Sequence, residues 1–161
     1  MEKEKLYADL LLQLSGLIEG ETCEVSVLAN AAALLREMMG ERFFWVGFYL
    51  VRDGQLVLGP FQGSPACYRI AHGRGVCGTA WAKQQTLVVP DVEEFPGHIA
   101  CSSLSRSEIV VPMTDPDGHV RAVLDIDSRE LNAFDNVDAR HLEQAAAIIS
   151  QALYGKVPSD S

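Results

Sequence analysis

The run from Phe43 to Val51, FFWVGFYLV, is the feature that most constrains how this 161-residue chain can fold. Aromatic and β-branched residues are enriched in strands, so the run predicts a β-strand. Asp53-Gly54 follows it directly and is a strong signal for a two-residue hairpin turn. The turn predicts that residues 56–58 return as the partner strand. The fold must therefore contain an antiparallel sheet.

Further strands are expected along the chain, in an order that extends this sheet. Short strands are predicted over 66–70 and 87–89. Longer strands are predicted over 108–113 and 119–127, joined by the turn TDPDG. Adjacent strands joined by tight turns form a mostly antiparallel sheet. The segment 91–105 has no clear period, and a loop of that length is usually a lid or a binding loop.

Helical periodicity appears at both ends of the chain. Leucines recur at helical spacing from 6 to 17, and Gly20 is a fitting stop. A second helix is predicted over 22–40, a short one after the glycine-rich turn HGRGVCG, and a last one capped by Asp135. The predicted fold class is α+β, with a central, mostly antiparallel sheet, N- and C-terminal helices on one face and ligand-binding loops on the other.

Composition excludes several functional classes. Lys and Arg number 13 and Asp and Glu number 22, giving a formal net charge of −9, so there is no basic stripe for nucleic acid. No apolar run reaches the ~20 residues of a membrane helix, and the polar N-terminus is unlike a signal peptide. We expect a cytoplasmic protein with one domain over 1–154 and a flexible tail over 155–161.

Strand alternation assigns side chains to the two faces of the sheet. The predicted core face, against the helices, comprises Phe44, Val46, Phe48 and Leu50 in the first strand and Val120, Ala122, Leu124 and Ile126 in the last. Trp45 and Tyr49 then point to the opposite face, and Gly47 between them should leave a gap. Packing under the loops is the simpler interpretation of these two aromatic rings.

Carboxyl groups are expected on that same opposite face. Asp125 and Asp127 alternate with core residues in the last strand, and Glu108 begins the strand that should pair with it. Asp is rare inside strands, although a solvated strand end is the simpler explanation. Carboxylates that converge with aromatic rings suit a small cation such as an ammonium group. Clustered carboxylates also raise one another's pKa, which favours a general acid.

Three of the four cysteines lie in or beside loops. Cys77, in GRGVCGTA, lies at the junction between a loop and a predicted helix. Backbone N–H groups at the start of that helix would stabilise a thiolate. Inert buried cysteines, a metal site and a redox pair formed by two of the loop cysteines Cys67, Cys77 and Cys101 all stay open. His98 and Cys101 could ligate a metal together, but no Cys-x-x-Cys pair completes a zinc pattern, so no metal is expected. Cys23 is interpreted as a packing residue or a neighbour of the helix cap.

Several motifs in a fixed order resemble one known family. They are FFWVGFYL, LVLGPFQG, ACYRI, GRGVCGTA, GHIACSS, SEIVVP and AVLDIDS. Over nearly its whole length the chain is similar to the free methionine-(R)-sulfoxide reductases, which are small GAF-domain proteins. It departs from their pattern mildly at Ser102, where an acidic residue is more usual. The resemblance implies a GAF fold. It also implies an oxidoreductase that acts in oxidative stress and reduces free methionine (R)-sulfoxide, not oxidised methionine inside proteins.

The resemblance also implies roles for the cysteines. Cys101 corresponds to the thiol that attacks the sulfoxide sulfur and becomes a sulfenic acid. Cys67 would condense with it to a redox-active disulfide, which thioredoxin reduces by exchange. Cys77 is the alternative attacking thiol or a relay. No bound cofactor is implied, because thioredoxin supplies the electrons.

The implied substrate-binding residues are Trp45, Tyr49, Glu108, Asp125 and Asp127. One carboxyl group would donate a proton to the departing oxygen, and the others would hold the substrate's ammonium group. The implied partners are free methionine-(R)-sulfoxide and thioredoxin, with no nucleic acid and no membrane. Homodimerisation through the terminal helices stays open. The competing functions are a non-catalytic GAF module that senses a small ligand and a structural or interaction protein with inert thiols.

Overall fold

The computed structural model describes residues 2–98 and 104–155. The first half of the chain forms α1 (Glu2–Ile18), α2 (Glu24–Met39), the 3-10 turn η1 (Gly40–Arg42), β1 (Trp45–Arg52), β2 (Gln55–Gln62) and β3 (Arg69–Ala71). The second half forms α3 (Gly75–Lys83), β4 (Leu87–Val89), the 3-10 turn η2 (Val92–Glu94), β5 (Ser107–Thr114), β6 (Val120–Ser128) and α4 (Asn136–Tyr154). No helix within these ranges is long and apolar enough to cross a bilayer.

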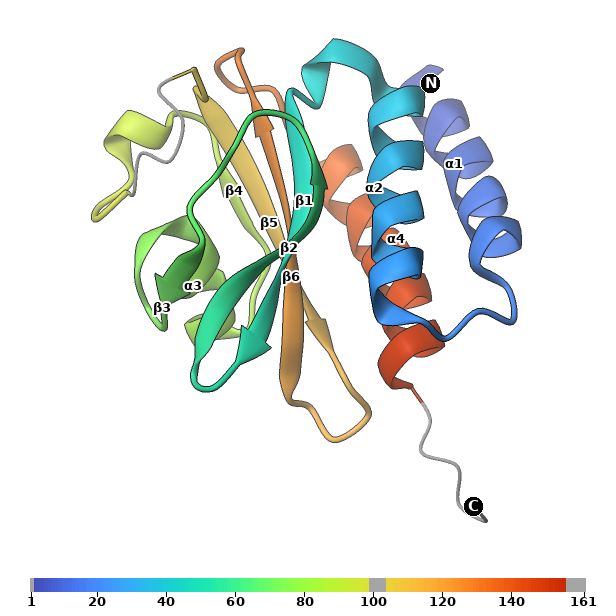
Figure 1. Ribbon diagram of the computed structural model, residues 1–161. Helices are drawn as coiled ribbons and strands as arrows, with labels where there is room; N and C mark the ends of the chain where they lie inside the picture. The colour runs from blue at the N-terminus through green and yellow to red at the C-terminus, as the bar shows by residue number, and fades with distance from the viewer. Residues whose placement is uncertain (1, 99–103, 156–161) are drawn as a thin grey trace.

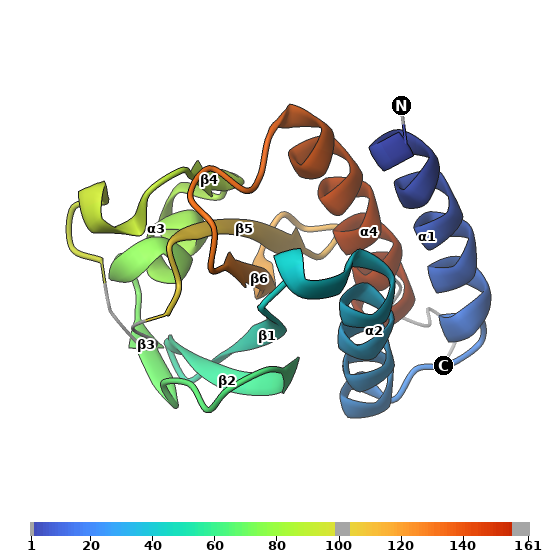
Figure 2. The same cartoon turned by 90° about the horizontal axis from the view of Figure 1, so that it is seen from above.

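The strands form one sheet in the order β3-β2-β1-β6-β5-β4, with every neighbouring pair antiparallel. Helices α1, α2 and α4 lie on one side of it and α3 on the other (Figure 1). From above, α2 and α4 lie next to the sheet and α1 is the outermost layer (Figure 2). The α+β class and the helix-covered face predicted from the sequence are confirmed.

The hairpin between β1 and β2 forms where the sequence places it. Asp53 and Gly54 both have positive φ, of 53° and 79°, as a type I′ turn requires. The partner strand β2 is longer than the predicted 56–58 because it continues pairing with β1 up to Val46–Gln62. The strand predicted over 66–70 lies at Arg69–Ala71, where it pairs with the start of β2.

Two buried clusters lie on opposite faces of the sheet. The larger includes Val46, Phe48 and Leu124 and fills the space between the sheet and the helices. The smaller includes Trp45 and Tyr49 and lies on the opposite face, where α3 packs. Each fully buried large apolar side chain contributes about 1.5–3 kcal/mol, so the helix-covered cluster supplies most of the burial energy.

Two residues of the predicted core face are on the wrong side. Phe43, not Phe44, is fully buried against the helices, and Phe44 packs against the smaller cluster. The alternation begins only at Trp45, where β1 starts, so it cannot be extended backwards to Phe44. Val120 also joins the smaller cluster. It pairs with Thr114 after a register shift in the β5–β6 ladder, which breaks the alternation there.

The predicted cap of α4 is part of a buried polar network. Asp135 accepts hydrogen bonds from the backbone N–H groups of the first turn of α4, and Asp138 accepts one from the Asp135 N–H, which completes a capping box. Asp138 is fully buried and also accepts hydrogen bonds from Tyr7 and from Lys3 Nζ at 2.6 Å. Arg42 of η1 donates to the same carboxylate at 2.9 Å. One carboxylate therefore joins α1, η1 and α4.

Replacing Asp138 with Ala should lower the free energy of unfolding by about 3 kcal/mol or more, because it leaves several donors without their acceptor. Urea denaturation measures the loss. Glu4→Ala is the matched control, because it breaks the ion pair between Glu4 of α1 and Arg140 of α4. The side chain of Arg140 is 55% exposed and that of Glu4 is 42% exposed, so this change should affect stability little. Equal losses in the two variants would contradict the importance of the buried carboxylate.

Candidate functional site

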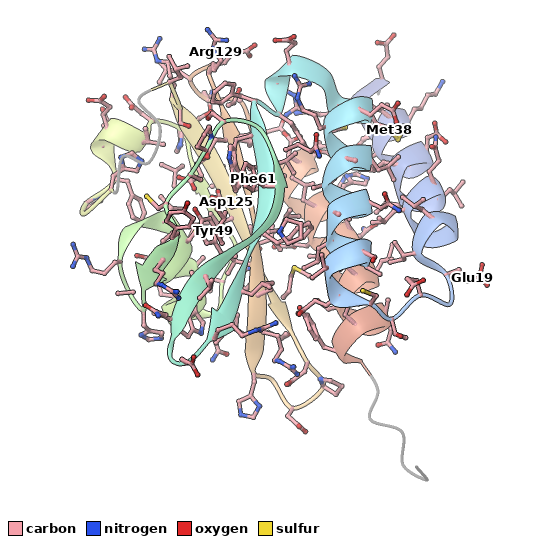
Figure 3. All side chains as sticks on the ribbon, viewed as in Figure 1. Glu19, Met38, Tyr49, Phe61, Asp125 and Arg129 are labelled. Carbon is pink, nitrogen blue, oxygen red and sulfur yellow. The ribbon has the colours of Figure 1, made fainter. Side chains whose placement is uncertain are left out.

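A pocket opens on the face of the sheet away from α1, α2 and α4. Trp45 and Tyr49 of β1 and the carboxyl groups of β5 and β6 line it, and Cys77 of α3 lies opposite. Figure 3 shows Tyr49 and Asp125 together on this side of the sheet.

Strand pairing brings the three candidate carboxyl groups together. Glu108 of β5 is directly opposite Asp127 of β6, and Asp125 is two residues away on the same face. Only 7% of Glu108 and 5% of Asp125 is exposed to solvent, whereas Asp127 is partly buried. We call these three residues the carboxyl cluster.

Burial dominates the electrostatics of the carboxyl cluster. It raises the pKa of Glu108 and of Asp127 well above the ordinary values, and the charge of Asp125 raises both further. Burial also raises the pKa of Asp125, although hydrogen bonds with Glu108 and Cys77 act in the opposite direction. Groups this close do not all ionise together. The cluster therefore retains a proton that it can donate.

The aromatic wall of the pocket is tied to the loop after β2. Trp45 Nε1 donates a hydrogen bond to the backbone oxygen of Ser64 at 2.9 Å, and Tyr49 Oη donates to that of Cys67 at 3.0 Å. The Trp45 ring stacks on Phe61, with centroids 5.1 Å apart, and on Tyr49, at 6.1 Å. These contacts fix the segment that carries Cys67 relative to the pocket.

The gap predicted beside Gly47 is not there. A Cβ at Gly47 would lie 2.3 Å from the Phe61 Cβ and 2.8 Å from the Trp45 ring. At Gly63, where φ is +139°, a Cβ would lie 2.6 Å from the same indole. The space that the two glycines leave is filled by the Trp45 and Phe61 side chains, so glycine here permits close packing of the aromatic wall and leaves no cavity.

The structure contradicts the thiolate expected at Cys77. The residue does lie in the first turn of α3, but its side chain is only 4% exposed. Its Sγ and one carboxyl oxygen each of Glu108 and Asp125 are within 4.8 Å of one another. Burial and these carboxyl charges raise the pKa of the thiol well above its ordinary value. They outweigh the helix N-terminus, which is worth only about 0.3–1 kcal/mol at an exposed site.

The other cysteines have distinct environments. Cys67 is disulfide-bonded, and Cys101 lies outside the described residues. Cys23 and Cys77 have free thiols. Cys23 is exposed at the N-cap of α2, which agrees with its interpretation as a residue at the helix cap and not with the alternative of a packing residue. A hydrogen bond from Ser26 lowers the pKa of its thiol.

Comparison with known proteins agrees with this architecture. The GAF domain family matches residues 24–153. The chain belongs to the GAF domain family. A Dictyostelium discoideum protein named GAF domain-containing protein A is 55% identical over 91% of this chain and 92% of its own. The free methionine-R-sulfoxide reductase of Escherichia coli is 46% identical over 95% of this chain and 92% of its own.

A solved structure extends this likeness to three dimensions. It is the X-ray structure of free methionine-R-sulfoxide reductase from Neisseria meningitidis in complex with its substrate, and it aligns with a TM-score of 0.90 and 52% identity. The alignment covers 94% of this chain and 90% of that one. The resemblance that the motifs indicate is confirmed.

Two polar side chains that line the pocket of this GAF domain were not predicted as binding residues. His98 was considered only as a metal ligand, and Ser105 carried no sequence signal because it lies in an aperiodic loop. Ser105 Oγ and Asp125 Oδ1 are buried without a hydrogen-bond partner among the described residues. Buried polar atoms are normally paired, so a polar ligand or a water molecule in the pocket would satisfy these two.

The raised pKa of Glu108 predicts that Glu108→Gln stabilises the protein at neutral and alkaline pH. When folding raises the pKa of an acid, the folded protein loses stability as the pH rises above the pKa that the acid has in the unfolded chain. The reason is that the acid then ionises in the unfolded chain and stays protonated in the folded one. Each such pH unit costs about 1.4 kcal/mol. Thermal unfolding should therefore show a gain for Glu108→Gln that grows with pH above about 4. A change that is independent of pH would contradict the buried acid.

Proposed function

We propose that this protein reduces free methionine (R)-sulfoxide to methionine and is recycled by thioredoxin. The observation that carries the proposal is that a proton-holding carboxyl cluster and an aromatic wall meet in one pocket, beside a cysteine that is disulfide-bonded. Relatives named free methionine-R-sulfoxide reductase, with 41% and 46% identity, support the same activity.

The carboxyl cluster has two tasks in this proposal. Its ionised members bind the ammonium group of the free amino acid by charge-assisted hydrogen bonds. A protonated member donates to the sulfoxide oxygen as the sulfur is attacked, and the raised pKa of Glu108 and Asp127 suits them to this step. A pocket that needs a free ammonium group excludes methionine sulfoxide within a peptide chain.

The aromatic wall takes the apolar end of the substrate. The Trp45 and Tyr49 rings are buried, and their polar atoms are already bonded to backbone oxygens. Their faces therefore contact the methyl and methylene groups beside the sulfoxide. Sulfur next to aromatic rings gains a further ~0.3–1.5 kcal/mol.

The thiol chemistry is assigned to Cys101 and Cys67. His98 and Ser105, which flank the segment carrying Cys101 in the sequence, both line the pocket. We propose that the Cys101 thiolate attacks the sulfoxide sulfur, so that methionine leaves and Cys101 holds the oxygen as a sulfenic acid. The Cys67 thiol then displaces water and forms a disulfide, and a thioredoxin dithiol reduces it. The sum is one sulfoxide and one dithiol converted to methionine, one disulfide and water.

Cys77 is less suited to the attack than Cys101. Its raised pKa keeps the thiol protonated, and its hydrogen bond with Asp125 favours a role in positioning that carboxyl group. The alternative of a sensor module that only binds a ligand gives no reason for a disulfide-bonded cysteine beside the pocket.

A coupled assay tests the proposed activity. Thioredoxin, thioredoxin reductase and NADPH are supplied with the protein and one diastereomer of free methionine sulfoxide. The R form should drive NADPH oxidation, and the S form and a peptide that contains methionine sulfoxide should not. No oxidation with the R form would overturn the proposal.

Single-turnover measurements on reduced variants separate the cysteine roles. Cys101→Ser should release no methionine, because the attacking thiol is gone. Cys67→Ser should release one equivalent and stop at the sulfenic acid, which dimedone traps. Cys77→Ser and the exposed control Cys23→Ser should each release one equivalent and form the disulfide. Full release by Cys101→Ser, with none by Cys77→Ser, would reverse the assignment.

A further inference from the structure

Cys77, Glu108 and Asp125 form a compact group of potential metal ligands, which we call the thiol–carboxyl cluster. Its three donor atoms lie within 4.8 Å of one another, although the residues come from α3, β5 and β6. All three side chains are more than nine-tenths buried, and all line the pocket. A small ion can therefore reach them from the pocket mouth.

An unpaired atom in this cluster points to a missing ligand. Asp125 Oδ1 is buried without a hydrogen-bond partner among the described residues. A buried carboxyl oxygen in that state costs free energy, and the nearby carboxyl groups of Glu108 and Asp127 increase the cost when they ionise. A cation in the cluster removes both penalties at once.

We propose that the thiol–carboxyl cluster binds a thiophilic divalent cation of the zinc type. One sulfur and two carboxylate oxygens are a donor set that Zn²⁺ accepts, commonly with three protein ligands and a fourth position left to water. Mg²⁺ and Ca²⁺ prefer oxygen alone and more ligands than this cluster offers. On binding, the cation loses part of its hydration shell, and the thiol and carboxyl protons pass to the solvent.

The cation would occupy the place that the proposed function gives to the substrate's ammonium group. Glu108 and Asp125 cannot hold both at once, so the metal and free methionine sulfoxide exclude each other. This part of the inference rests on the proposed function, and it makes zinc-type ions competitive inhibitors. The absence of a Cys-x-x-Cys pair does not argue against the site, because its ligands are far apart in sequence.

Cobalt(II) is a suitable probe, because a cobalt–thiolate bond gives a near-ultraviolet charge-transfer band. The titration uses the disulfide form without reductant, in which Cys23 and Cys77 are the free thiols among the described residues. The wild-type protein should give the band, a stoichiometric amount of Zn²⁺ should abolish it, and excess Mg²⁺ should not. A wild-type protein without the band would overturn the proposal.

Matched variants locate the thiolate. Cys77→Ser, a near-isosteric change, should lose the band, and Cys23→Ser should keep it. Asp125→Asn should shift the titration midpoint to higher cobalt concentration. Asp115→Asn is the control for cation binding elsewhere on the chain, because Asp115, Asp117 and His119 at the β5–β6 turn form another group of potential metal ligands, and it should leave the band unchanged. A band that persists in Cys77→Ser, with its unfolding temperature confirming a folded chain, would overturn the proposal.

Competition tests the exclusion separately. Free methionine sulfoxide should move the cobalt midpoint to higher concentration in proportion to its own concentration, and an unmoved midpoint would overturn the exclusion. The coupled reductase assay is independent of this titration. If that assay fails while Cys77→Ser abolishes the band, the proposed function falls and the metal site stands.

Discussion

The antiparallel pairing of β1, β6 and β5 is the constraint on which the rest of the structure depends. Side chains alternate with a period of two, so one register assigns every residue of these strands to a face. In this register Leu124 and Ile126 pack under the helices. Asp125, which lies between them in the sequence, points into the pocket on the opposite face. A slip of one residue would bury the carboxyl groups in the helical core and destroy both faces together.

The two faces have opposite effects on stability. The helix-covered face buries apolar side chains. Its buried carboxylate, Asp138, accepts hydrogen bonds from Lys3, Tyr7 and Arg42. The pocket face buries acids that repel one another, together with polar atoms that have no hydrogen-bond partner in the part of the chain that the structure describes. The first offsets the cost of the second, as is common where a site needs groups in an unfavourable environment.

Local signals predicted much of this molecule. The hairpin at Asp53-Gly54 and the cap at Asp135 depend on residues close in sequence, and both form as expected. The shared face of Asp125 and Asp127 follows from the strand period alone. Family resemblance, not spacing, supplied the roles of the cysteines.

Contacts between distant segments explain what the sequence could not show. Phe44 and Val120 were misplaced because a strand start and a register shift interrupt the alternation. The protonated state of Cys77 depends on acids more than thirty residues away in the sequence, which no local pattern reveals. Ser105 enters the pocket through an aperiodic loop, so no periodicity indicated it.

The packing of Trp45 also limits how the sequence of this protein can change. Its indole occupies the space that a side chain at Gly47 or Gly63 would need, and it stacks on Phe61. Replacing the indole alone would not admit a larger residue at either glycine, because a Cβ at Gly47 would still lie 2.3 Å from the Phe61 Cβ and Gly63 keeps a φ of +139°. Both glycines are therefore held by the path of the backbone as well as by the indole, so a substitution at Trp45 can change the shape of the aromatic wall but cannot make room for side chains at 47 or 63.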